Sequence, residues 1–330
     1  MRISVVIVTR NRSSLLDATL DGLRRQDFRP GDEVVVVDNG STDATPDVIA
    51  RAAQGFPARF TTFRETTPGK TPALNKGIAT TTGEILALTD DDVVVSEGWI
   101  ATIRRIFLEG PLDLAGGRVD PRWEAAPPRW LHIEDHGRYG PMTSPLALLH
   151  YGEAGELGER TAVGANLTVR RSVFDHLGGF APHLGRSPGT LLCGEDHDFC
   201  QRAAAAGYRC EYRPELRARH WVPAERTRLT YYLRWFFWSG VTNARLDRRP
   251  GTGGLDTAER VVTSAYFVRR LLLAPARVLA SALAGRPGDA VRAAMDGAFV
   301  LGVLSERIRY RVRGENVPRA AHEQASALVR

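Results

Sequence analysis

The sequence predicts an α/β fold in which a mostly parallel sheet is flanked by helices and followed by a C-terminal helical region. Short apolar runs rich in β-branched residues alternate with helical periodicities over roughly the first ninety residues, which is typical of βαβ units. From residue 227 onward the pattern becomes helical and strongly basic. We therefore expect one domain over residues 1–225, with halves 1–120 and 121–225, and a basic helical region over residues 226–330.

The first four strands are expected in chain order, each followed by a loop at the same edge of the sheet. The predicted strands are residues 3–8, 34–37, 60–63 and 84–88, and the apolar face Leu15, Leu16, Thr19, Leu20 and Leu23 predicts the first helix. The segment NGSTD follows the second strand. There Ser41 or Thr42 is placed to cap a helix that runs through Val48 and Ile49. A third helix is expected over residues 73–80.

The rest of the first domain has weaker periodicity. Residues 121–158 are rich in Pro, Gly, His and Trp, which favours a long functional loop with little secondary structure. Residues 163–169 predict a strand, residues 195–206 a helix, and residues 208–219 an extended segment. No internal repeat is visible.

Charge is divided unevenly along the chain. Residues 216–330 hold 20 Arg and no Lys against 9 Asp and Glu, a net charge of +11, whereas the remaining residues carry −5. A basic surface attracts anionic partners such as phospholipid headgroups or nucleic acid, although a solvated, Arg-rich helical surface explains the pattern as well. We do not expect nucleic-acid binding to be the function.

The cysteines and the apolar runs indicate the compartment. Cys193, Cys200 and Cys210 are an odd number at spacings unlike a zinc site, so they are interpreted as reduced thiols. The N-terminal apolar run is too short for a signal peptide. Residues 271–284 fall short of the roughly 20 apolar residues that cross a bilayer. We expect a cytoplasmic protein, either free or in peripheral contact with the inner face of the membrane.

Three adjacent acids, Asp90, Asp91 and Asp92, follow the strand predicted over residues 84–88. Because neighbouring carboxylates repel one another, a site that gathers them favours a bound cation or strong hydrogen-bond donors. Oxygen ligands suit Mg²⁺ or Mn²⁺, which typically binds one or two carboxylates, substrate phosphates and water. A solvated acidic turn is the alternative.

Two further residues extend this site. Asp38 ends the second strand, where a carboxylate can accept hydrogen bonds from a base or ribose; a helix cap is its alternative, a role that Asp43 can fill equally. Lys70 and Lys76 are the only lysines beside 42 arginines, and both lie in PGKTPALNKG. A compact ammonium is a good point-charge partner for phosphate, so Lys70 is the candidate for a diphosphate and Lys76 a solvated residue.

Five segments, in order, resemble the family 2 glycosyltransferases, enzymes of the Rossmann-like GT-A fold. They are SVVIVTRNR, EVVVVDNGSTD, PGKTPALNKGIATTTGEILALTDDDV, VGANLTVRRSVFDHLGGF and GEDHDFCQRAAAAGYRCEYRP followed by His220. The resemblance covers roughly residues 2–245. It implies an inverting, hexosyltransferase-type enzyme whose donor is a nucleotide-sugar, expected to be a UDP-sugar, with residues 1–120 as the nucleotide-sugar half and 121–225 as the acceptor half.

The resemblance also implies roles for individual residues. Thr9 and Asp38 would contact the nucleotide, together with Arg10 and Asn11, which stand where the family often has Tyr and Asn. Lys70 and Asp90 complete the donor set. Asp91 would be the main ligand of Mn²⁺ or Mg²⁺, helped by Asp90 or Asp92, although Thr89 stands where family members often have the first Asp. His220 would lie near the metal or diphosphate; a core histidine is its alternative.

The remaining implied residues concern transfer itself. Asp196, preceded by Glu195 at the start of a helix, matches the catalytic base, because an attacking hydroxyl must lose its proton; helix N-terminal acids that complement the dipole are the alternative. Gly164, Ala165 and Asn166 would form the floor beneath the donor sugar. Four aromatic or imidazole side chains of the long loop either stack on sugars or belong to the core: Trp123, Trp130, His132 and Tyr139.

Two other functions compete with transfer to a glycan, lipid-linked or small-molecule acceptor. A sugar nucleotidyltransferase uses a similar sheet and the same metals, but it places a Gly-rich loop after the first strand, where this chain has TRNRSS. A catalytically inactive nucleotide-binding scaffold at the membrane would need neither the acid triplet nor the Glu-Asp pair. Sugar transfer requires these two groups to lie on opposite sides of one ligand.

Overall fold

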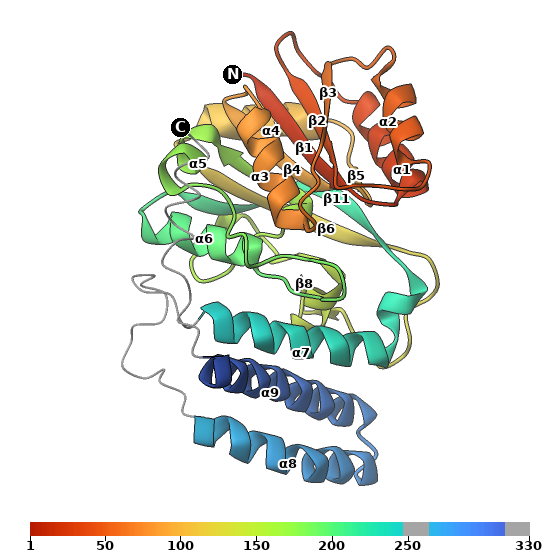
Figure 1. Ribbon diagram of the computed structural model, residues 1–330, viewed down its shortest axis with the longest axis vertical. Helices are drawn as coiled ribbons and strands as arrows, with labels where there is room; N and C mark the ends of the chain where they lie inside the picture. The colour runs from red at the N-terminus through yellow and green to blue at the C-terminus, as the bar shows by residue number, and fades with distance from the viewer. Residues whose placement is uncertain (247–263, 314–330) are drawn as a thin grey trace.

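The computed structural model describes residues 1–246 and 264–313 and shows a mixed α/β fold followed by a C-terminal helical region (Figure 1). A nine-stranded sheet has the order β3-β2-β1-β4-β10-β6-β11-β5, with β9 paired to β11. Its strands are β1 (Ile3–Thr9), β2 (Glu33–Asp38), β3 (Arg59–Arg64), β4 (Ile85–Asp90), β5 (Val93–Val95), β6 (Leu114–Trp123), β9 (Gly155–Glu156), β10 (Leu167–Arg170) and β11 (Cys210–Val222). A separate hairpin pairs β7 (Glu134–Asp135) with β8 (Arg138–Tyr139).

Helices connect and flank these strands. They are α1 (Ser13–Arg24), α2 (Thr45–Ala53), α3 (Lys70–Thr80), α4 (Trp99–Glu109), α5 (Arg171–Leu177), α6 (Glu195–Ala205), α7 (Leu229–Leu246), α8 (Ser264–Leu283) and α9 (Pro287–Arg313). Short 3₁₀ turns are η1 (Pro141–Leu146), η2 (Gly164–Asn166) and η3 (Ala224–Thr227). The predicted α/β class, with a mostly parallel sheet and a helical C-terminal region, is confirmed.

Strands β3, β2, β1 and β4 run parallel and deliver their last residues to one edge of the sheet. Thr9 pairs with Asp38, and Val8 pairs with Asp90. Strands β1, β2 and β4 are almost wholly buried, as expected of central parallel strands covered on both faces. The alternation of strand and helix in the sequence therefore places the acid triplet where ligands of such sheets bind.

Three local predictions were wrong. The helix after β2 starts at Thr45 with neither Ser41 nor Thr42 as its cap; instead Asp43 accepts a hydrogen bond from the Thr45 amide at 3.0 Å. Residues 164–166 form the turn η2, so the strand predicted over 163–169 is only β10, antiparallel to β4. The first residues of the loop predicted over 121–158 belong to β6.

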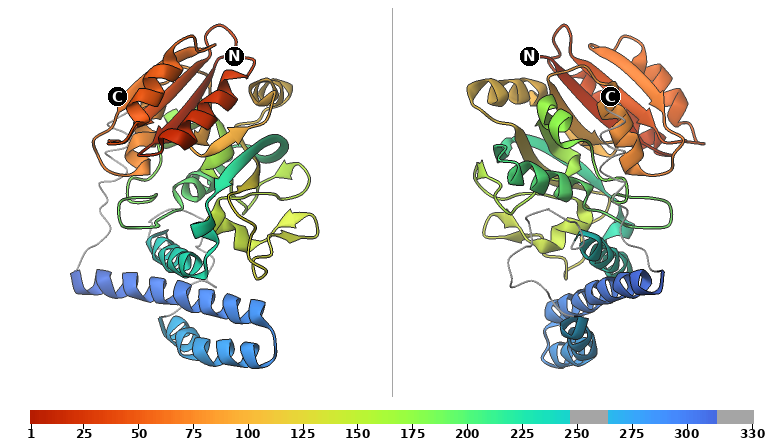
Figure 2. Two further views of the ribbon diagram at one scale, coloured as in Figure 1. Left: turned by 90° about the vertical axis from the view of Figure 1, so that its right-hand side faces the viewer. Right: turned by 60° about the vertical axis from the view of Figure 1, so that its left-hand side comes forward.

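The C-terminal helices stack in the order α7, α9, α8, with α7 next to the α/β part (Figures 1 and 2). Two glycines allow α7 and α9 to approach closely, because a Cβ on Gly240 would collide with the carbonyl of Phe299, and one on Gly302 with that of Phe237. Nowhere in residues 1–246 and 264–313 is there a helix with the length and apolarity to cross a bilayer.

Candidate active site

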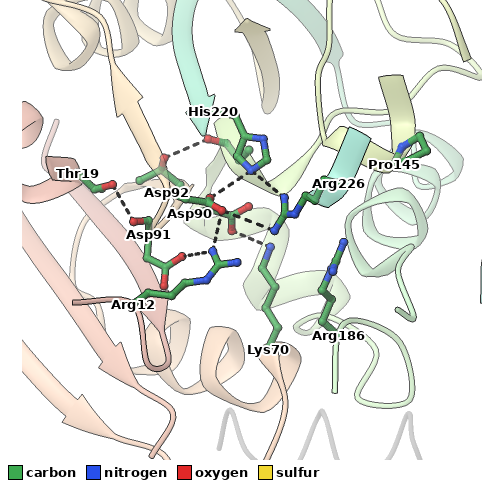
Figure 3. Close-up of polar contacts among 12 residues, drawn as sticks. Arg12, Thr19, Lys70, Asp90, Asp91, Asp92, Pro145, Arg186, His220 and Arg226 are labelled. Carbon is green, nitrogen blue, oxygen red and sulfur yellow. Dashed lines mark hydrogen bonds and ion pairs between the residues drawn. The ribbon is translucent and has the colours of Figure 1, made fainter. Parts of the chain in front are cut away.

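A cavity of about 680 Å³ opens at the carboxyl ends of β1 and β4. Residues from distant parts of the chain form its wall, including Thr9, Arg10, Arg12, Lys70, Asp90, Asp91, Asp92, Gly164, Ala165, Arg186, Glu195, Asp196, His220, Arg226 and Trp235. Figure 3 shows the charged side chains of this wall turned toward one another. Volumes of this size accommodate small molecules such as nucleotide-sugars.

Lys70 joins the two acidic groups of the cavity. Its Nζ lies 2.7 Å from Asp90 Oδ1 at the end of β4 and 3.8 Å from Glu195 Oε1 at the start of α6. Burial alone would lower the pKa of Lys70, but Asp90 and Glu195 outweigh it and raise this pKa. The ammonium is therefore charged, and it contacts both Asp90 of the acid triplet and Glu195 of the Glu-Asp pair. That the two acidic groups flank one ligand stays a prediction.

The carboxylate of Asp196 is held by backbone amides. Its Oδ2 accepts a hydrogen bond from the Gly164 amide at 2.9 Å, and its Oδ1 accepts one from the His197 amide at 2.8 Å. A Cβ on Gly164 would lie 3.7 Å from Lys70 Nζ and 3.9 Å from Asp196 Oδ2. A side chain at residue 164 would therefore lie beside the Lys70 ammonium and the Asp196 carboxylate, whereas glycine leaves this space open.

Glu195 is buried beside Asp196 and Lys70. Burial and the nearby Asp196 together raise the pKa of Glu195 to about 7, against the opposing effect of Lys70. Gly194 precedes it with a positive φ of 92°, and a Cβ there would lie 2.8 Å from Thr242 Cγ2 on α7. The start of α6 is therefore packed directly against α7.

Arg12 binds the other two acids of the triplet. Its Nη1 donates to Asp91 Oδ1 at 2.8 Å and to Asp92 Oδ2 at 2.6 Å. Burial raises the pKa of Asp91 to about 6, against the effect of Arg12. Burial also favours a higher pKa for Asp92, but His220, Arg12 and Arg226 outweigh it and lower that pKa. The repulsion expected among the three acids is thus offset by arginine and lysine side chains of the protein.

The same two carboxylates are the candidate ligands of a divalent metal. The described residues contain no group of three or more His, Cys, Asp or Glu side chains arranged around a metal position. His220 Nε2 instead lies 3.2 Å from Asp92 Oδ1 and 3.4 Å from Arg226 Nη1. The buried Asp92 Oδ1 has His220 Nε2 close to it but receives no well-oriented hydrogen bond. One or two carboxylates with such an incompletely satisfied oxygen fit Mg²⁺ or Mn²⁺ that takes its other ligands from phosphates and water.

Residues 4–178, more than half of the chain, match the sequence model described as Glycosyl transferase family 2. The chain belongs to this family. The enzyme is 25% identical over 251 residues to the glucosyl-dolichyl phosphate glucuronosyltransferase of Haloferax volcanii, covering 75% of this chain and 78% of that one. It is 27% identical to the O-antigen chain rhamnosyltransferase RfbN of Salmonella typhimurium, covering 67% and 66%.

Solved structures agree on the fold of this glycosyltransferase. The mannosyltransferase PcManGT of Pyrobaculum calidifontis, in complex with GDP-Man and Mn²⁺, superposes with a TM-score of 0.65 at 20% identity, covering 93% of this chain and 87% of that one. Residues 1–349 of TarS from S. aureus, in complex with UDP-GlcNAc, give a TM-score of 0.51 at 15% identity, covering 96% and 93%. At these identities the likeness shows the GT-A fold.

Several side chains predicted for the site of this glycosyltransferase lie elsewhere. Asn166 is fully buried and accepts a hydrogen bond from Trp99 Nε1 at 3.0 Å, so it braces the core and does not line the floor of the cavity. Trp130 packs edge-on against Tyr232, with ring centroids 5.0 Å apart, and Trp123 packs against the same core. Neither tryptophan lines the cavity, so the structure favours the alternative that both belong to the core.

Two residues of the predicted nucleotide set also lie outside the cavity wall. Asp38 Oδ1 accepts a hydrogen bond from the Ser41 amide at 2.9 Å, and Asn11 Oδ1 accepts one from the Thr42 amide at 2.7 Å. Both side chains thus order the loop between β2 and α2. A role for either in binding the nucleotide stays a prediction.

Sequence reasoning missed the arginines of the glycosyltransferase site. Arg12, Arg186 and Arg226 all line the cavity, but nothing in their local sequence distinguishes them from the other arginines of the chain. Trp235 and Tyr151 are the large aromatic side chains of the wall. The sequence predicts a helical region from residue 227 onward, but it gives no sign that one side of α7, with Trp235, faces a cavity.

Proposed function

We propose that this glycosyltransferase moves a sugar from a UDP-sugar to a hydroxyl of a glycan or lipid-linked acceptor, with inversion and with the help of a divalent metal. One observation carries the proposal: Lys70 Nζ contacts Asp90 on one side and Glu195 on the other. A donor diphosphate bound at this ammonium would lie between the acid triplet and the Glu-Asp pair. These are the two groups that an inverting transfer needs on opposite sides of one bond.

The donor would take its place among positive side chains. Thr9 and Arg10 line the cavity at the end of β1 and would contact the nucleoside. We keep Asp38 and Asn11, which lie outside the cavity wall, as further proposed contacts of the nucleotide. Lys70, Arg186 and Arg226 face the same space. Ammonium and guanidinium groups bind phosphate oxygens with charge-assisted hydrogen bonds. The diphosphate would replace Asp90 as one partner of Lys70.

Asp91 and Asp92 would hold Mn²⁺ or Mg²⁺, because both carboxylates contact Arg12 Nη1 and so lie side by side, and because Asp92 Oδ1 receives no well-oriented hydrogen bond. When bound, the metal would supply Lewis-acid stabilisation to the departing diphosphate. PcManGT, which has a similar fold, forms a complex with GDP-Man and Mn²⁺, and this supports the proposal of a divalent metal. His220 would then position Asp92, which it contacts at 3.2 Å.

Asp196 is the proposed base. Two backbone amides orient its carboxylate, so one of its oxygens can receive the proton of an acceptor hydroxyl. The hydroxyl oxygen then forms a bond to the anomeric carbon as the bond from that carbon to the phosphate oxygen breaks. The electron pair of the broken bond leaves with the nucleoside diphosphate. A single displacement of this kind inverts the anomeric centre and needs no covalent intermediate.

A thermal-shift panel tests the donor, since a ligand that binds the native state raises its stability. The panel holds UDP-, GDP- and dTDP-sugars, each with and without Mn²⁺, followed by an assay of nucleoside diphosphate release with acceptors. We expect the largest Mn²⁺-dependent shift with a UDP-sugar. A shift with GDP-sugars alone would overturn the choice of UDP, and a metal-independent shift and turnover would overturn the metal. Tight UDP binding with no turnover on any acceptor would favour a scaffold.

A peripheral contact between the C-terminal helices and a membrane completes the proposal. Such a contact would bring a lipid-linked acceptor to the cavity. The first relative named above acts on a glucosyl-dolichyl phosphate by its name, which supports an acceptor of this class.

A further inference from the structure

Exposed apolar side chains gather on the two outermost helices. In the described parts of the chain, the large hydrophobic side chains that face solvent lie on α8 and α9, apart from Leu108 and Leu229. Those on the two helices are Val268, Leu272, Leu273, Leu279, Leu283, Leu301, Ile308 and Val312. Contiguous exposed apolar surface on a folded protein marks an interaction site.

Four of these side chains form a stripe along α8, which we call the α8 stripe: Val268, Leu272, Leu279 and Leu283. Their spacings of four, seven and four residues place them on one face of a helix. Their exposed fractions are 44%, 75%, 61% and 80%. The stripe is therefore continuous and open along nearly the whole of α8.

The α8 stripe is not the face that attaches α8 to the protein. Phe267 and Ala274 are buried on another side of α8, where Arg307 of α9 lies over the Phe267 ring at 4.9 Å. A Cβ on Gly297 of α9 would lie 3.1 Å from Ala274 Cβ. Figures 1 and 2 show α8 as the layer farthest from the sheet. Folding of the helical region thus leaves the stripe without a partner in the described residues.

Charge complementarity indicates what covers the stripe. Residues 264–313 contain nine arginines and three acids. Asp296 is paired with Arg270 and Arg277, and Glu306 with Arg245 and Arg309. Arg269 and Arg286 are exposed beside the two ends of the stripe. Leucines on one face with arginines along their border are typical of helices that lie in the interface of an anionic membrane.

We propose that α8 lies flat on an anionic lipid bilayer, with the α8 stripe in the boundary between headgroups and acyl chains and Arg269 and Arg286 on lipid phosphates. Among the three C-terminal helices, α7, which lies on the other side of α9 from α8, forms part of the cavity wall. Trp235 and Thr242 of α7 line it, and the close contact of Gly240 with Phe299 locks α7 to α9. A lipid-linked acceptor would then reach the cavity from the bilayer, a consequence that rests on the proposed function.

Vesicle sedimentation with the full chain tests the proposal. The vesicles contain phosphatidylcholine alone or with phosphatidylglycerol, and no donor or acceptor is present. The wild type should bind vesicles with phosphatidylglycerol, and added salt should weaken this binding. The Leu272→Asp/Leu279→Asp variant should bind about tenfold or more weakly, because two apolar side chains lose their burial and two negative charges are added.

Two control variants separate the apolar contribution to vesicle binding from the electrostatic one. Leu108→Asp changes a side chain that is 67% exposed on α4 and should bind vesicles as the wild type does. Arg269→Gln/Arg286→Gln should lose the preference for phosphatidylglycerol while keeping the apolar contribution. The four side chains that these variants change on α8 and just after it are all exposed, namely Arg269, Leu272, Leu279 and Arg286. Each variant should therefore unfold at the temperature of the wild type.

Three results would overturn the proposal. They are no vesicle binding by the wild type, equal binding by the Leu272→Asp/Leu279→Asp variant, and a lipid-free wild-type dimer that this variant converts to a monomer in analytical ultracentrifugation. The last result would assign the stripe to a second copy of the chain. Since sedimentation needs no turnover, failure here leaves the proposed transfer intact, and loss of the proposed transfer leaves a positive vesicle result intact.

Discussion

Replacing Asp196 by Asn is the most direct test of the proposed base, because it removes the proton acceptor and changes almost no volume. General-base catalysis by a positioned side chain contributes about 10²–10⁴-fold. This range corresponds to about 2.7–5.4 kcal/mol in the activation free energy at about 1.36 kcal/mol per decade. We therefore expect kcat to fall by about 10²–10⁴, while the KM for the donor changes little because the proposed role of Asp196 is toward the acceptor.

The structure also sets a stability cost for this substitution. Asp196 accepts hydrogen bonds from the amides of Gly164 and His197, one on each oxygen. An Asn side chain has only one oxygen, so one of these amides would face an NH₂ group. A backbone donor left without a partner costs about 1–3 kcal/mol. The melting temperature should therefore fall by a few degrees, and the kinetic loss must exceed what this small change explains.

Steady-state kinetics of nucleoside diphosphate release, with donor binding measured by titration calorimetry, checks the prediction. The control is Asp47→Asn, which removes an exposed acid from the first turn of α2 and so reproduces the loss of helix-dipole stabilisation without touching the cavity. Turnover by Asp196→Asn within a few-fold of the wild type would refute the assignment. An equal loss in Asp47→Asn would also refute it, because the effect would then come from stability.

The other predictions concern the metal, pH and the helical region. Asp91→Ala should weaken Mn²⁺-dependent donor binding by tenfold or more in calorimetry, since one of two carboxylate ligands is lost; unchanged Mn²⁺ dependence would exclude this ligand. Glu195 has a pKa of about 7 against 4.5 in the unfolded chain. Glu195 therefore stays protonated to a higher pH in the native state than in the unfolded chain. The free energy of unfolding that it contributes falls by about 1–3 kcal/mol as the pH rises from about 5 to 7. Urea unfolding at pH 5 and pH 8 should show this loss in the wild type but not in Glu195→Gln. Gly240→Ala should lower the melting temperature, because its Cβ would collide with the Phe299 carbonyl, at a cost of about 1–3 kcal/mol or more. Calorimetric scans should show no such effect for Gly288→Ala on α9, where a Cβ meets nothing within 4 Å.

The elements that carry the site could be predicted because their signals are local. The buried runs of β1, β2 and β4 identify central parallel strands, and such strands end at one edge wherever they lie in the sequence. The position of Asp90 beside the end of β1 follows from this rule. Glycine before an acidic helix start likewise indicated α6, and its N-terminus lies at the cavity.

Side-chain direction in irregular segments could not be predicted. Asn166 follows two residues that line the cavity, Gly164 and Ala165, yet it turns inward because Trp99 Nε1 and two backbone carbonyls are buried beside it. Trp130 does not line the cavity because its ring packs against the ring of Tyr232, which lies about one hundred residues later in the chain. Such partners are decided by contacts between distant segments, which no local pattern records.

From the sequence alone came the α/β class, the basic helical region and the identity of the acids at the end of β4 and the start of α6. These follow from periodicity, residue type and chain order, which act over a few neighbouring residues. Only the tertiary structure decided that Lys70 lies between the two acidic groups, that Arg12 binds Asp91 and Asp92, and that the α8 stripe faces outward. The physical reason is that charge pairing and burial depend on which surfaces meet when distant segments pack together.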